Sequence, residues 1–169
     1  MQKYSNLPPE TVTYLELIDR RDFRASRKFD GNVDITLQQP PDPQLNRHLY
    51  NTVGGDWLWI DRLPWTDDEW HGYANQPNLE TWIARAQGEL AGYFELLVGS
   101  DSSVAIVQFG LVPDFIGRGL GGHLLTAAVE RGWEMSGSRV WLHTSSRDHP
   151  NAQANYQARG FRVFKREGP

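Results

Sequence analysis

A cluster of glycines stands where a helix pattern begins. Residues 112–125 read VPDFIGRGLGGHLL, with four glycines in six positions and Arg118 among them. A glycine inside a helix costs about 1 kcal/mol relative to alanine, so helix stability does not explain this choice. The N–H groups at the start of a helix have no partner within it, and the helix dipole favours a negative charge there. The glycines and Arg118 therefore predict an anion-binding loop, in preference to a flexible loop or a close helix–sheet contact.

Two familiar phosphate loops do not fit this segment. Gly117, Gly119 and Gly122 match the spacing G-x-G-x-x-G of dinucleotide-binding folds. In those folds the first glycine follows its strand directly, and an acidic residue ends the next strand. Here residues 113–116 intervene, and the next expected strand, 140–144, holds no acidic residue. No Gly-Lys-Ser/Thr follows the glycines, so the segment is not a P-loop either.

The elements that position this loop follow from hydrophobic periodicity and turn residues. The order of strands and helices predicts an α/β or α+β fold with a mixed sheet in a single domain. Strands are expected at residues 11–18, 33–37, 81–87, 88–98, 103–112, 139–144 and 161–165, and helices at residues 43–53, from 66 onward, 119–136 and 151–159.

Size and composition exclude several classes of protein. The 169 residues suit one domain, and the net charge of −4 offers no basic surface for nucleic acid or anionic lipid. There is no cysteine, and the five histidines show no paired metal-ligand spacing, so neither a disulfide nor a metal site is expected. No window approaches the ~18 apolar residues of a membrane span, and the N-terminus lacks a signal-peptide pattern. We therefore expect a soluble, cytoplasmic protein without a nucleic-acid or membrane partner.

Two segments together resemble a known family. Residues 116–121 (IGRGLG) resemble the Q/R-x-x-G-x-G/A pyrophosphate loop of the GCN5-related N-acetyltransferases, the GNAT superfamily. Residues 151–161 (NAQANYQARGF) are similar to the family's N-x-x-A-x-x-x-Y-x-x-x-G-F region, with one spacing difference. This second segment agrees best when it is anchored on Tyr156, Gly160 and Phe161.

The resemblance covers about residues 88–165 and implies one GNAT-like domain over residues 1–169. Its expected fold is a mixed, mostly antiparallel central sheet flanked by helices, with a splayed cofactor cleft. The resemblance further implies an acetyl-CoA-binding core at about residues 88–165 and an acceptor side at about residues 1–87.

The cofactor implied by the resemblance is acetyl-CoA. It would lie between the strand that ends at Val112 and the strand at 139–144, with the glycine amides around the pyrophosphate. Asn151 is expected either to cap the short helix and contact the pantetheine arm, or to be a purely structural cap. The cofactor-binding residues implied are Leu111, Val112, Ile116, Gly117, Arg118, Gly119, Leu120, Gly121, Gly122, Asn151 and Tyr156.

Direct acyl transfer needs a base for the ammonium, a donor for the oxyanion and an acid for the departing sulfur. Tyr156 resembles the family's general acid, although core packing would also explain a tyrosine there. Many members carry a glutamate where this chain has Ala105. Glu95 and His143 are the alternatives for the base, and a structural role is equally open for each.

The acceptor side is rich in tryptophan and carboxylates. Trp57, Trp59, Trp65 and Trp70 would form either an aromatic wall for an amine or ordinary core and lid packing. The carboxylates that would add negative potential at the entrance are Asp61, Asp67, Asp68 and Glu69.

The function implied by the resemblance is an acetyl-CoA-dependent N-acetyltransferase acting on a primary amine of a small molecule or peptide. One alternative is a non-catalytic acyl-CoA-binding domain, suggested by Ala105. Another is a nucleotide-binding module of unrelated fold. Homodimers are frequent in the family, and the acceptor, the acyl-chain preference and the oligomeric state stay open.

Overall fold

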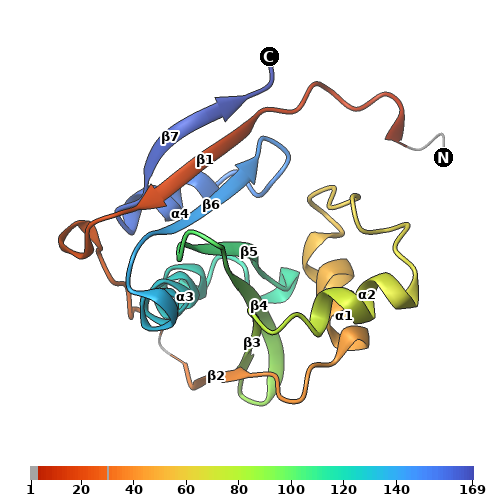
Figure 1. Ribbon diagram of the computed structural model, residues 1–169, viewed down its shortest axis with the longest axis horizontal. Helices are drawn as coiled ribbons and strands as arrows, with labels where there is room; N and C mark the ends of the chain where they lie inside the picture. Colours follow the sequence, from red (N-terminus) through yellow and green to blue (C-terminus); the bar gives the residue numbers. More distant parts are fainter. Residues whose placement is uncertain (1–3, 30) are drawn as a thin grey trace.

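One seven-stranded sheet runs through the computed structural model, which describes residues 4–29 and 31–169 (Figure 1). The strands lie in the order β2-β3-β4-β5-β6-β1-β7. Their bounds are β1 Val12–Leu17, β2 Val33–Leu37, β3 Leu79–Ala86, β4 Glu89–Val98, β5 Val104–Leu111, β6 Val140–Ser145 and β7 Arg162–Glu167.

Helices α1 and α3 cover opposite faces of the β4–β5 part of the sheet, α2 packs against α1, and α4 packs against α3. Helices α1 and α2 lie on the right of Figure 1, and α3 and α4 lie on the left. Successive residues of a strand face opposite sides: Gly110 of β5 faces Val53 of α1, whereas Leu111 faces Gly121 of α3. The helices are α1 Pro43–Gly54, α2 Asp67–Ala74, α3 Leu120–Ser136 and α4 Ala152–Ala158, with 3-10 turns η2 Arg20–Asp22 and η3 Pro113–Phe115.

The sheet is antiparallel except between β5 and β6. These two parallel strands pair only at Val104–Val140 and Ala105–Trp141. The remainder of β5 pairs with β4 alone, so its other edge opens beyond Ala105. The expected mixed, mostly antiparallel sheet with a splay between these strands is confirmed.

Strand β1 lies between β6 and β7, although it precedes both by most of the chain. It pairs antiparallel with β6 from Val12–Ser145 to Leu17–Val140, and with β7 on its other side. The N-terminal segment therefore completes the part of the sheet that faces β5 across the splay.

Local sequence signals explain where the helices begin and end. Thr66 and Glu69 form the expected capping box of α2, in which the Glu69 carboxylate accepts from the Thr66 N–H at 2.7 Å. Helix α3 begins after Gly119 and ends before Gly137, and both glycines have a positive φ. The expected strands and helices are confirmed, with boundaries shifted by one or two residues.

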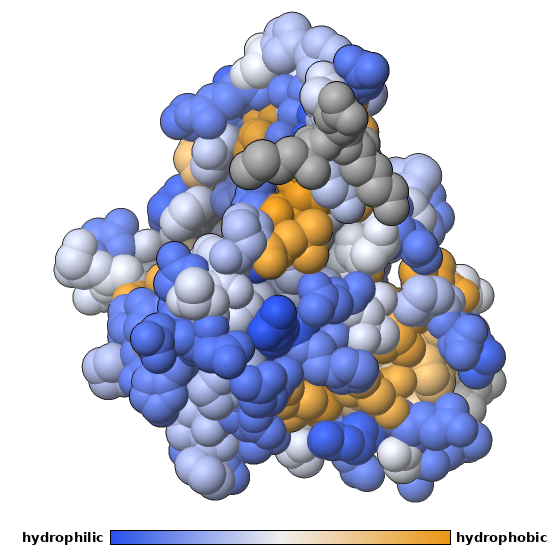
Figure 2. All heavy atoms as spheres, turned by 90° about the vertical axis from the view of Figure 1, so that its right-hand side faces the viewer, coloured by the Kyte–Doolittle hydropathy of each residue, from blue (hydrophilic) through white to orange (hydrophobic). Residues whose placement is uncertain are grey.

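The face that carries α1 and α2 is largely hydrophilic, with apolar side chains in separate patches (Figure 2). Among the described residues, no helix is long and apolar enough to cross a bilayer. The same part of the chain contains no group of three or more side chains placed to hold a metal ion.

Candidate active site

The glycine loop connects η3 to α3 and leaves the start of that helix uncovered. Gly117 and Gly119 both have φ of +83°, in the left-handed region that favours glycine. A Cβ placed on either residue would meet no atom within 4 Å. Gly119 is the N-cap of α3, and no side chain caps the helix there. The first amides of α3 therefore lack a side-chain acceptor, and open space lies beside the loop.

A cavity of about 550 Å³ opens beside this loop, at the end of β5 that does not pair with β6. Its walls come from the glycine loop, the end of β5, helix α4 and the segment after α1. The lining residues are Val53, Trp57, Trp59, Phe109, Gly110, Leu111, Ile116, Gly117, Gly119, Gly121, Asp148, His149, Asn151, Ala152, Asn155 and Tyr156.

Tyr156 lies on α4 and lines this cavity. Its ring packs edge-on against Phe109 and Phe161, with centroids 6.0 Å and 6.2 Å away. Among the described residues, nothing forms a hydrogen bond with its hydroxyl group. Burial, reinforced by the charge of Asp148, raises the pKa of Tyr156 above its ordinary value. The phenol therefore keeps its proton at neutral pH and can donate it into the cavity.

A second, smaller cavity of about 220 Å³ adjoins the first. The two share Trp57, Trp59, Phe109, Asp148 and Tyr156 in their walls. The remaining lining residues of the smaller cavity are Glu10, Val12, Tyr50, Leu58, Asp61, Ile106, Val107, Gln108, Leu142, His143 and Ser145. Tyr156 thus stands where the two cavities meet.

Asp148 holds the boundary between the cavities together. Its Oδ1 accepts from Trp59 Nε1 at 3.1 Å, and its Oδ2 accepts from Thr144 Oγ1 at 2.6 Å and from Ser145 N at 2.8 Å. One carboxylate therefore joins the segment after α1 to the end of β6. Sequence reasoning missed this role, because the contact with Trp59 spans most of the chain.

Several of the expected cofactor residues share the larger cavity, and others do not. Val112 and Leu120 are buried, and Arg118 is exposed with its guanidinium over the Phe115 ring. Gly122 packs against Arg159 and Ser26, with a Cβ there 2.6 Å from Arg159 Nη1 and 3.1 Å from Ser26 Cβ, and it does not line the cavity. The expected residues that line the cavity are Leu111, Ile116, Gly117, Gly119, Gly121, Asn151 and Tyr156.

The expectation that Asn151 caps α4 through its side chain is wrong. Asn151 is the N-cap residue, but its side chain forms no capping hydrogen bond. An N-cap side chain usually reaches the amides of the first turn when its own backbone is extended. Asn151 instead has helical φ and ψ of −91° and 0°. Its backbone N–H instead donates to His149 Nδ1 at 3.0 Å, and the residue lines the larger cavity.

Glu95 is fully buried on β4 and lines neither cavity. Asn46 Nδ2 donates to its Oε1 at 3.0 Å, the Tyr73 hydroxyl donates to its Oε2, and Arg62 Nη1 lies 3.7 Å from Oε2. Burial raises the pKa of Glu95, although Arg62 and the donors around it oppose the shift. His143, the other expected base, is an exposed β6 residue that lines the smaller cavity.

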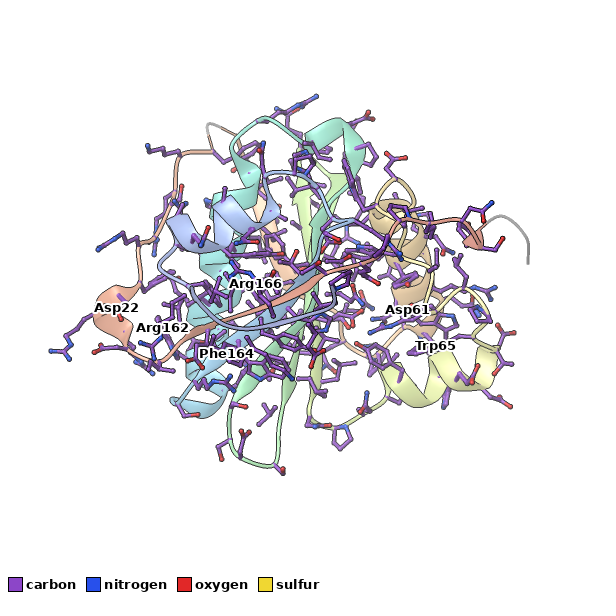
Figure 3. All side chains as sticks on the ribbon, turned by 90° about the horizontal axis from the view of Figure 1, so that it is seen from above. Asp22, Asp61, Trp65, Arg162, Phe164 and Arg166 are labelled. Atoms are coloured by element: carbon purple, nitrogen blue, oxygen red, sulfur yellow. The ribbon has the colours of Figure 1, made fainter. Side chains whose placement is uncertain are left out.

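The four tryptophans between residues 57 and 70 divide into two pairs. Trp57 and Trp59 line both cavities. Trp65 and Trp70 instead pack against each other at 4.8 Å, and the guanidinium of Arg62 lies over both rings. Figure 3 shows Trp65 beside helices α1 and α2. This second pair encloses Arg62, the cation that faces buried Glu95, and lines neither cavity.

Comparison with known proteins gives partial matches to curated acetyltransferases. A putative [ribosomal protein bS18]-alanine N-acetyltransferase of Bacillus subtilis is 31% identical over 98 residues, covering 57% of this chain and 64% of that protein. A mycothiol acetyltransferase of Corynebacterium aurimucosum is 25% identical, covering 86% of this chain and 55% of that protein. The chain thus spans between 55% and 64% of the length of these two relatives.

The fold has counterparts among solved structures. A GCN5-related N-acetyltransferase from Sphaerobacter thermophilus superimposes with a TM-score of 0.74 at 16% identity, covering 95% of this chain and 50% of that chain. The family model described as Acetyltransferase (GNAT) family matches residues 46–161. These residues include the glycine loop, Tyr156 and most of both cavity walls. The chain belongs to the GNAT acetyltransferase family.

Proposed function

We propose that this protein transfers the acetyl group of acetyl-CoA to a primary amine of a small molecule or peptide, by direct attack in a ternary complex. One observation carries the proposal: the open glycine loop and the proton-bearing Tyr156 line the same cavity. The curated relatives, one named as a mycothiol acetyltransferase and one as a putative alanine N-acetyltransferase, support the same reaction class.

The residues of the larger cavity fit coenzyme A. The uncapped amides of α3 and the open space beside Gly117 and Gly119 suit a pyrophosphate, which needs close approach to backbone N–H groups. The free edge of β5 suits the amide groups of a pantetheine arm, which would pair with it as an added strand does. Acetyl-CoA would supply the acetyl group as a reactive thioester.

Tyr156 and His143 divide the proton transfers in this proposal. The neutral amine nitrogen attacks the thioester carbonyl, and the carbon–sulfur bond breaks. The Tyr156 hydroxyl gives its proton to the departing sulfur. His143 takes up the proton that the amine loses, because an imidazole can change charge near neutral pH and this one lines the acceptor-side cavity. We prefer His143 to Glu95, whose oxygens are already engaged with Asn46, Tyr73 and Arg62.

We further propose that the two halves of the chain divide the work. Residues 88–165 provide the glycine loop, β5 and α4, which we assign to acetyl-CoA. Residues 1–87 provide Trp57, Trp59 and Asp61, which we assign to the acceptor side.

The non-catalytic alternative gains no support from Ala105. This residue pairs with Trp141 at the closed end of the splay and lines neither cavity. Ala105 therefore stands apart from the two cavities that we assign to the reaction, and its identity does not favour the non-catalytic alternative.

Two measurements test the proposed function. Calorimetry with CoA and acetyl-CoA measures binding, and release of free thiol from acetyl-CoA over a panel of amines measures transfer. We expect binding to both nucleotides, thiol release with at least one amine, and slower release in His143→Gln. Binding without thiol release for any amine would favour the non-catalytic alternative, and no binding would end the assignment.

A further inference from the structure

We infer that the smaller cavity selects a small amine that carries a second positive charge and no carboxylate. This inference rests on the proposed function, because it names the class of acceptor for the same site. It is argued from the charges, the unpaired groups and the size of the cavity.

The charged walls of the smaller cavity are predominantly acidic. Glu10, Asp61 and Asp148 line it, and among the described residues the cavity wall contains no lysine or arginine and one histidine, His143. Carboxylates around a small space attract cations and repel anions. The potential of this cavity therefore favours an ammonium group.

The three carboxylates differ in whether a cationic side chain already pairs with them. Glu10 accepts from Ser145 Oγ at 2.5 Å and lies 3.5 Å from Arg147 Nη1, so a cation already neutralises it in part. Asp148 accepts three hydrogen bonds, all from neutral donors, and within the described residues no cationic side chain forms an ion pair with it.

The carboxylate of Asp61 is the group available to a ligand. Within the described part of the chain, no side chain or backbone N–H forms a hydrogen bond or an ion pair with it. Asp61 lies on the segment between α1 and α2, beside these helices in Figure 3. It thus offers a free anion in the wall away from α4, the helix that carries Tyr156.

One aromatic ring adds to the attraction for a cation. Trp57 lines the smaller cavity, and the face of such a ring attracts an ammonium group within about 6 Å, whereas the Tyr50 ring is buried with the Arg62 guanidinium already 5.6 Å from its centroid. A diamine could therefore place one nitrogen near Tyr156, where the cavities meet, and the other near Asp61.

The size of the cavity limits the acceptor. Its 220 Å³ is below the roughly 300–1,000 Å³ of pockets that hold drug-sized ligands. An amino acid or a peptide C-terminus would also bring a carboxylate, for which the part of the wall formed by residues 4–29 and 31–169 provides no lysine or arginine. The walls therefore favour a short diamine over an amino acid, a peptide or a simple monoamine.

Three four-carbon compounds test this inference: putrescine, its monoamine analogue butylamine and its carboxylate analogue γ-aminobutyrate. We expect kcat/KM, measured by thiol release from acetyl-CoA, to be highest for putrescine and lowest for γ-aminobutyrate. In Asp61→Asn the ratio of putrescine to butylamine should fall about fivefold, because ion pairs with exposed carboxylates are weak. Asp56→Asn is the matched control: it removes an exposed carboxylate from the same segment that lines neither cavity, and it should keep the ratio.

Binding separates this inference from the proposed reaction. Calorimetric titration of putrescine into the CoA-bound protein measures the cavity without turnover, and we expect weaker binding in Asp61→Asn. Equal or better use of butylamine or γ-aminobutyrate, an unchanged ratio in Asp61→Asn, or no putrescine binding overturns the inference, even where acetyl transfer occurs. Asp61-dependent putrescine binding without thiol release from any amine would sustain the binding preference and overturn the reaction.

Discussion

Replacing Tyr156 with phenylalanine removes one hydroxyl group and little else. The ring contacts with Phe109 and Phe161 are kept, and the lost hydroxyl forms no hydrogen bond with any described residue. The free energy of unfolding should therefore change by less than about 0.5 kcal/mol. If the hydroxyl protonates the departing sulfur, kcat should fall by roughly 10²–10⁴, equivalent to about 3–5 kcal/mol in the activation barrier.

The assay is thiol release at saturating amine and acetyl-CoA, with acetyl-CoA affinity and thermal unfolding measured on the same variant. Because burial raises the pKa of Tyr156, the wild-type enzyme should show no loss of rate from this group up to its ordinary pKa of 10. A Tyr156→Phe variant with wild-type kcat would refute the general-acid assignment. A variant with reduced acetyl-CoA affinity and unchanged kcat would assign Tyr156 to binding alone.

Three further predictions concern the glycine loop, the buried ion pair and the tryptophans. Gly119→Ala should weaken CoA binding at least about tenfold in calorimetry and cost about 1–2 kcal/mol of stability, because its φ of +83° disfavours a Cβ; unchanged affinity would contradict the loop assignment. Arg62→Met should lower the free energy of unfolding in urea by about 3 kcal/mol, because it leaves Glu95 buried without its cation. Adding Glu95→Gln should recover part of that loss, and a double variant no more stable than Arg62→Met would argue against the pairing. Trp57→Ala should raise the acceptor KM, whereas Trp65→Ala should lower the melting temperature with little effect on KM, and the reverse pattern would place the acceptor elsewhere.

Local signals were enough to predict the elements of the fold. Alternation in β1, the capping box at Thr66 and the glycines that flank α3 each depend on neighbouring residues, and all are confirmed. The insertion of β1 between β6 and β7 depends on pairing between distant segments, which periodicity does not encode.

The candidate site was predictable from the sequence where the backbone conformation requires a particular residue type. Gly117 and Gly119 are such positions, since their positive φ favours glycine. The roles of Asp148 and Glu10 could not be predicted, because they arise from contacts between segments that are distant in the sequence. Trp57 and Trp65 are equivalent as sequence, and only their packing assigns one to the cavities and the other to Arg62.

The position of β1 also determines which fragments of the chain can carry the cleft. Strand β7 has β1 as its sole neighbour in the sheet, and β6 pairs with β5 at only two positions. A polypeptide trimmed to residues 46–161, the limits of the family match, would keep the glycine loop and Tyr156 but lose β1 and β7. Strand β6 would then be an edge strand with unpaired backbone groups, which promote aggregation. Refolding of the whole chain should also be slow, because β1, near the N-terminus, must pair with β6 and β7, near the C-terminus.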